Sequence, residues 1–116
     1  MSRSYEVEVR EVVDGQEVRL AGALGVREVP DVRLVLHEVI DTGLGDVRVD
    51  LCGAELLDST ALGMILECHL RARRCGRRLQ LVATTARTRR LLAALRLDRA
   101  LLPPRERTHT VSTLTA

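Results

Sequence analysis

Aromatic side chains are almost missing from this sequence. Its 116 residues include one tyrosine, Tyr5, and no tryptophan or phenylalanine. Proteins that bind single-stranded nucleic acid usually stack bases on aromatic side chains, so the composition disfavours that class. With 46% hydrophobic residues, the length suits one globular domain. Its core must be built from leucine, valine, isoleucine and alanine.

Lysine is absent, and all 18 basic residues are arginines. Glycine-rich loops that bind nucleotide phosphates carry a lysine, so the sequence offers no support for phosphoryl transfer by this chain. The three cysteines, Cys52, Cys68 and Cys75, fit neither a disulfide framework nor a zinc motif. We expect free thiols that are buried or partly buried, and we expect no metal or cofactor.

Long apolar runs are also missing. None approaches the roughly 18 residues that a membrane span requires, and the chain does not open with the pattern of a secretory leader. We therefore expect a soluble, cytoplasmic protein without membrane association. Residues 1–58 carry 6 arginines against 13 acidic residues, whereas residues 59–116 carry 12 against 3. Arginines that cover apolar surface or meet an acidic protein explain this asymmetry better than nucleic acid does.

The first half of the chain changes from strand-like to helical patterning. Alternating apolar and polar residues predict strands over 5–12 and 16–21, joined by the Asp14-Gly15 turn. After a break at 22–25, apolar residues recur at helical spacing behind Pro30, which suits a first helical turn. This helix is expected to end at the glycines of 42–45.

The second half repeats a strand-then-helix order. We expect a strand at 47–51, a helix from Ser59 to a C-terminal cap at Gly76, a strand at 78–83, a helix over 85–95 and a short edge strand within 97–102. This order predicts an α/β fold with a mixed sheet of four to five strands, its later strands parallel and helices packed on it. The whole chain, 1–116, is expected to form one domain, with a core over about 5–102 and a polar tail over 103–116.

The most informative segment is Asp58-Ser59-Thr60-Ala61-Leu62-Gly63, where a predicted strand leads into a predicted helix. Ser59 is expected to be the N-cap, with its hydroxyl oxygen accepting a hydrogen bond from an unpaired N–H of the first turn. A helix N-terminus also favours phosphate. Ser59 is therefore either a plain cap or a phosphate acceptor.

A hydrolase nucleophile is the enzymatic alternative for Ser59. The nucleophile elbow needs small residues two positions before and after the serine, and Leu57 occupies the first of these. His37 and His69 fall within predicted helices, where a lone histidine such as His69 is usually a packed side chain. We therefore expect no catalytic residue and no enzymatic activity.

The helix that follows Ser59 has a second distinctive side. On a helical wheel, Gly63, Met64, Glu67, Arg71 and Arg74 lie away from the apolar stripe. They form either a solvated charged face or a docking face. Docking is favoured because Gly63 permits close approach and Met64 is expected to be exposed with nothing to pack against.

The break at 22–25, the strand at 47–51, the 58–63 segment and the strand Leu79-Gln80-Leu81-Val82 together resemble the STAS domain, from about Val7 to Leu102. Within it, the chain is similar to bacterial anti-sigma factor antagonists. The resemblance implies binding to an anti-sigma factor that is also a Ser/Thr kinase. Unphosphorylated antagonist would hold the kinase and free the sigma factor, and phosphorylation of the motif serine, here Ser59, would release the kinase.

The resemblance also implies a partner-binding surface around the motif: Ala23, Leu24, Gly25, Asp58, Thr60, Gly63, Met64, Glu67 and Arg71. It further allows a phosphatase that acts on Ser59 and a monomer or weak homodimer. The family often has Gly-Glu-Leu-Asp in the loop where this chain has Ala23 and Gly25, without the carboxylates. A second interpretation therefore stays open, namely a STAS module that docks in a signalling or transport assembly without being phosphorylated.

Overall fold

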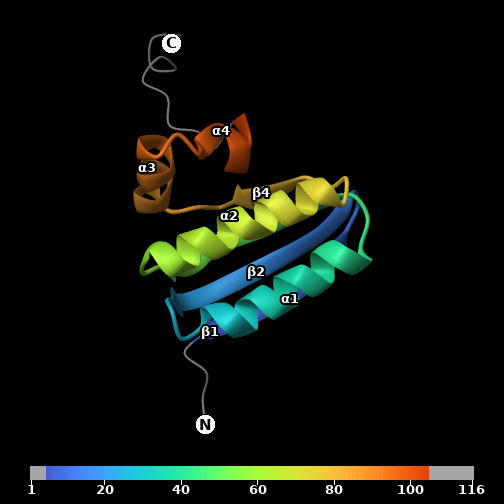
Figure 1. The fold of residues 1–116 in the computed structure, drawn as a ribbon, viewed down its shortest axis with the longest axis horizontal. Helices are drawn as coiled ribbons and strands as arrows, with labels where there is room; N and C mark the ends of the chain where they lie inside the picture. Colours follow the sequence, from blue (N-terminus) through green and yellow to red (C-terminus); the bar gives the residue numbers. More distant parts are fainter. Residues whose placement is uncertain (1–4, 105–116) are drawn as a thin grey trace.

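The computed structural model describes residues 5–104, so the predictions for the tail beyond 104 lie outside it (Figure 1). The elements are β1 (Tyr5–Val12), β2 (Gly15–Leu24), α1 (Val29–Thr42), β3 (Asp46–Leu56), α2 (Ser59–Arg74), β4 (Leu79–Val82), α3 (Ala86–Ala94) and α4 (Asp98–Leu101). None of the helices within 5–104 has the length and apolar character needed to cross a membrane.

The four strands form one sheet in the order β1-β2-β3-β4. β1 and β2 are antiparallel, whereas β2, β3 and β4 run parallel to one another. Helices α1 and α2 lie side by side across one face of this sheet, and α3 and α4 follow beyond the β4 edge (Figure 1). The prediction of a mixed α/β sheet with parallel later strands is confirmed.

The core lies between the sheet and the α1–α2 pair. Alternate residues of the three parallel strands point into it and are fully or almost fully buried: Val18, Leu20, Val47, Val49, Leu51, Leu79 and Leu81. The opposite face of the sheet is charged. There Arg19 lies 3.7 Å from Glu8 and 3.6 Å from Asp50. Because only one face of the sheet is buried, apolar and polar residues alternate along the strands.

Two strands extend further than the sequence suggests. β2 does not break at Gly22 but stays paired with β3 until Leu24 lies opposite Leu56. β3 accordingly runs to Leu56 rather than stopping at 51. Glycine and alanine have low strand propensity, yet parallel pairing between the two extended segments overrides it here. The longer strands carry the chain directly to the segment that contains Ser59.

The predicted edge strand at 97–102 is wrong, because α4 occupies this segment. Arg96 takes a left-handed conformation, with φ of 58°, and reverses the chain after α3. Leu101 N then donates to Leu97 O at 3.0 Å, which closes a helical turn. The turn places Leu101 and Leu102 in the core, where an edge strand would have left one of them exposed.

The end of α2 connects it to the rest of the core. Gly76 has φ of 72°, which favours glycine, and Arg77 N donates to Ala72 O at 2.8 Å. This pattern is a Schellman motif. The cap residue itself is Cys75, one position before the predicted Gly76. The motif turns the chain so that the Arg77 side chain passes beneath the end of α1.

Arg77 is a buried arginine, 6% exposed. Its guanidinium donates to Val39 O at 2.7 Å, to Gly45 O at 2.8 Å, to the carbonyl oxygens of Ile40 and Leu44 at 3.1 Å, and to the Gln16 side chain. Burial lowers the pKa of this group. One side chain thus joins the end of α1, the loop to β3 and the start of β2.

The three cysteines are free, as predicted, but only Cys68 is buried. Burial raises the pKa of the Cys68 thiol to about 12. The expectation of burial is wrong for Cys52 and Cys75, which are exposed.

Because the thiolate is the reactive form, we expect the native protein to release two equivalents from a thiol-specific disulfide reagent at pH 8. The third equivalent should appear only when urea unfolds the chain. Immediate release of three equivalents from the native protein would contradict the burial of Cys68.

Candidate functional site

Ser59 is the first residue of α2 and lies at the carboxyl ends of the parallel strands. β3 ends at Leu56, and Leu57 N donates to Leu24 O of β2 at 2.9 Å. Ligands and partners of parallel α/β sheets commonly bind at this edge. The Ser59 side chain is exposed, so its hydroxyl is accessible from solvent.

The prediction that Ser59 caps α2 is wrong, because Asp58 is the N-cap. Asp58 is extended, and its Oδ1 accepts hydrogen bonds from Thr60 N at 3.0 Å and Ala61 N at 3.1 Å. A charged carboxylate complements the helix dipole more strongly than a hydroxyl does. Ser59 therefore takes the first helical position, and its hydroxyl is not used by the cap.

The cap also holds the β2–α1 loop against the start of α2. Val26 N donates to Asp58 Oδ2 at 3.3 Å, and Gly25 N donates to Glu28 Oε1 at 2.8 Å. A Cβ on Gly25 would lie 3.1 Å from Asp58 Oδ2 and 3.3 Å from Leu57 Cδ1, so a larger residue would push the loop away. The predicted Gly25 and Asp58 are thus brought together.

Asp58→Ala is expected to lower the free energy of unfolding by about 1 kcal/mol, because two first-turn N–H groups lose their acceptor. Asp58→Asn should retain most of the cap, since an amide oxygen can accept the same bonds. Urea denaturation of the three proteins measures the difference. Equal stability of wild type and Asp58→Ala would show that the cap contributes nothing.

Two apolar residues beside Asp58 were not predicted from the sequence. Val26 is 64% exposed and Leu57 is 51% exposed. Each is a large apolar residue next to a polar turn residue, a pattern that the sequence contains but that periodicity does not detect. Their exposure beside the Ser59 hydroxyl forms a surface of mixed chemistry.

Other predicted site residues divide into exposed and buried ones. Ala23, Thr60 and Gly63 are exposed, whereas Leu24 is fully buried.

The prediction that Met64 is exposed is wrong, because its side chain is 0% exposed and packs in the core. The buried side of α2 is wider than the predicted stripe, since the helix contacts both the sheet and α1. Gly63 keeps its predicted property, because a Cβ added there would have nothing within 4 Å.

Glu67 and Arg71 are engaged with α1. Glu67 Oε1 lies 2.8 Å from His37 Nε2. Arg71 donates two hydrogen bonds to Asp41, at 2.9 and 2.7 Å, and this holds the pKa of the Asp41 carboxyl below its usual value. Such paired contacts orient both side chains along the helix seam. A partner would meet them as part of a fixed surface rather than as free charges.

One group of side chains has donor atoms close enough for a metal ion. His37, Glu67 and Cys68 each place a donor atom within 4.8 Å of the others. The His37–Glu67 contact already satisfies that pair, and the raised pKa of Cys68 keeps its thiol protonated. Arg33 adds positive charge 3.6 Å from Glu67. We therefore interpret the group as a hydrogen-bonded contact between α1 and α2, in which Glu67 also pairs with Arg33.

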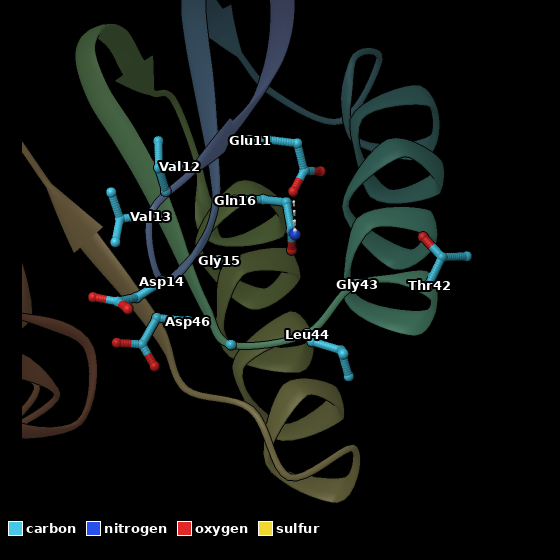
Figure 2. A pocket seen from close by; sticks show the side chains of 11 residues that line it. Glu11, Val12, Val13, Asp14, Gly15, Gln16, Thr42, Gly43, Leu44 and Asp46 are labelled. Carbon is cyan, nitrogen blue, oxygen red and sulfur yellow. Dashed lines mark hydrogen bonds between the residues drawn. The ribbon is translucent and has the colours of Figure 1, made fainter.

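A pocket of about 770 Å³ lies at the opposite end of the sheet, between the β1–β2 turn and the α1–β3 loop. Figure 2 shows Asp14 and Asp46 pointing outward at one side of it, while Gln16 Nε2 donates to Glu11 Oε1 at 3.0 Å. Thr42 supplies the hydroxyl among the described lining residues, and its Oγ1 donates to Glu38 O at 2.7 Å rather than to a carboxylate of the pocket. The pocket is separate from the Ser59 surface.

Comparison with known proteins identifies the family. A family model described as the Mlab, STAS domain matches residues 7–103. A solved anti-sigma factor antagonist from Mycobacterium paratuberculosis has a TM-score of 0.73 at 20% identity, covering 97% of this chain and 92% of that one. No curated protein sequence matches the chain.

Two further solved structures share the fold. The anti-sigma factor antagonist SpoIIAA in its unphosphorylated form has a TM-score of 0.69 at 15% identity, covering 94% of this chain and 93% of that one. The phosphorylated Bacillus cell fate determinant SpoIIAA has a TM-score of 0.67 at 14% identity, covering 95% and 97%. At these identities the likeness is one of fold, whereas the family assignment rests on the sequence match. From residue 7 to residue 103, this chain belongs to the Mlab, STAS domain family.

Proposed function

We propose that this protein is an anti-sigma factor antagonist without enzymatic activity of its own. Its unphosphorylated form binds an anti-sigma factor that is a Ser/Thr kinase, and the bound kinase releases its sigma factor. Phosphorylation of Ser59 then ends the binding, and a phosphatase acting on Ser59 restores it.

The observation that carries this proposal is the accessible Ser59 hydroxyl at the first position of α2. Asp58 fixes the backbone before it, so the serine is presented on rigid structure. The exposed Val26 and Leu57 beside it provide apolar contact area for a partner. Gly63 lies one helical turn further along and leaves room for close approach.

The position of Ser59 explains how a phosphate would act. A phosphate adds roughly −1.5 to −2 charge, and negative charge near a helix N-terminus is favoured by the helix dipole. The Asp58 carboxylate next to it opposes this gain. The two effects act in opposite directions, so phosphorylation leaves α2 folded. The partner, in contrast, would have to bury a doubly charged group against apolar surface, which is strongly unfavourable.

Incubation with candidate anti-sigma kinases and ATP, followed by mass spectrometry of peptides, tests the proposal. One phosphate on Ser59 is expected, and Ser59→Ala should carry none. Phosphate that persists in Ser59→Ala would remove Ser59 from this role. If the anti-sigma kinases encoded beside the protein bind it but never modify it, the phosphorylation-independent STAS module becomes the better interpretation.

A further inference from the structure

A pocket of about 450 Å³ with a basic lining lies between the C-terminal half of α2, β4 and α4. We call it the basic pocket. Its lining residues are His69, Arg73, Arg77, Arg78, Gln80, Arg99 and Ala100. Among the described residues, the lining contains no carboxylate. Four arginines around one concavity differ from an ordinary solvated face, where acidic residues are interspersed.

Three of these arginines come from different segments of the fold. Arg73 lies in α2, Arg78 immediately before β4, and Arg99 in α4. Within residues 5–104, Arg73 and Arg78 form no ion pair or hydrogen bond through their side chains. Arg77 differs, because its guanidinium is engaged with the α1 carbonyls. Arg73 and Arg78 thus bring positive charge to the pocket that no carboxylate of the described residues neutralises in an ion pair.

His69 forms part of the wall of the pocket. Its side chain lines the pocket and is 9% exposed. Burial and the neighbouring Arg73 lower the pKa of the His69 ring. The Nδ1 atom is itself buried, so the arginine side chains, rather than this nitrogen, supply the groups that can reach a ligand.

We propose that the basic pocket binds a small soluble molecule that carries a phosphate group. Arginine side chains contact phosphate oxygens in pairs of hydrogen bonds. Arg73 and Arg78 line the pocket, and their side chains have no other partner among the described residues. The volume is within the range of small-molecule sites. Ala100 is the one apolar residue among the described residues of the lining, so the site favours a polar ligand over a lipid tail.

The basic pocket is distant from the proposed phosphorylation site. Arg73 follows Ser59 by 14 positions on α2, which corresponds to about 21 Å along a helix. Ligand binding in the pocket and phosphorylation of Ser59 can therefore be tested separately.

Titration with inorganic phosphate at constant ionic strength, followed by amide NMR spectra, tests the proposal. Saturable shifts are expected at His69, Arg73, Leu79 and Arg99. The double variant Arg73→Gln/Arg78→Gln should weaken phosphate binding by at least about tenfold, since charged hydrogen bonds are lost. The matched control Arg74→Gln/Arg90→Gln removes the same charge from exposed positions outside the pocket. Its affinity should stay within about twofold of wild type.

Three outcomes would overturn the proposal. The first is an amide NMR shift that never saturates with phosphate, and the second is an equal loss of phosphate affinity in both double variants. Either result would mean that phosphate is attracted by the overall positive charge and not bound in the pocket. The third comes from flotation with phosphatidylcholine vesicles that contain phosphatidic acid. If the protein binds these vesicles and added inorganic phosphate does not reduce that binding, the pocket recognises a membrane surface instead of a soluble molecule. Circular dichroism of both double variants confirms that each is folded.

Discussion

Gly63→Trp is expected to weaken binding of the anti-sigma kinase by at least about 100-fold, equivalent to about 2.7 kcal/mol. Gly63 is exposed, one helical turn after Ser59, and a Cβ added there meets nothing within 4 Å. An indole therefore has room in the free protein but occupies the space in which a partner would approach α2. Calorimetric titration of a kinase that phosphorylates Ser59 measures the loss.

Controls separate this steric effect from damage to the fold. Gly63→Ala adds a single methyl group and should stabilise α2 by up to about 1 kcal/mol with little change in kinase affinity. Arg90→Trp places the same indole at an exposed position of α3 and should leave binding unchanged. If Gly63→Trp binds the kinase with unaltered affinity, the docking surface does not include this side of α2.

Arg77→Met is expected to lower the free energy of unfolding by about 3 kcal/mol, which is large for a single substitution. Methionine fills much of the same space but donates no hydrogen bond. The carbonyl oxygens of Ile40 and Leu44 would lose a donor, and Gln16, 7% exposed, would lose its charged partner. Unsatisfied buried groups account for most of the expected cost.

Urea denaturation followed by circular dichroism measures this loss, with Arg74→Met as the matched control. Arg74 lies near the same end of α2 but is exposed, so its replacement should change stability by less than about 0.5 kcal/mol. Similar stability of the two variants would mean that the buried guanidinium does not hold α1 to the sheet.

The order of the main elements could be predicted because their signals are local. Alternation in β1 and β2, helical spacing in α1, and the Thr85 cap of α3, whose hydroxyl accepts from Thr88 N at 3.2 Å, are all readable in short windows. The left-handed Arg96 has no such signal. An arginine rarely adopts this conformation, so nothing in the sequence indicates that α4 replaces a strand.

The junction between β3 and α2 could be predicted in position but not in detail. The sequence places the Asp58–Gly63 segment between a strand and a helix, as the structure does, yet whether Asp58 or Ser59 takes the cap depends on one backbone step. The prediction for Met64 is wrong because the helical wheel assumes a single buried stripe, whereas α2 packs against both the sheet and α1. Val26 and Leu57 are neighbours only because β2 and β3 end side by side in the folded chain. Local sequence patterns do not predict such a tertiary contact.

Phosphorylation of Ser59 as a switch is the central claim, and one binding measurement tests it most directly. Calorimetry should be run with the kinase against unphosphorylated protein and against protein phosphorylated stoichiometrically on Ser59, with amide spectra of both forms. We predict tight binding by the unphosphorylated form, a loss of at least about 100-fold on phosphorylation, and spectral changes confined to the start of α2 and the 25–28 loop. Equal affinity of the two forms would contradict the claim.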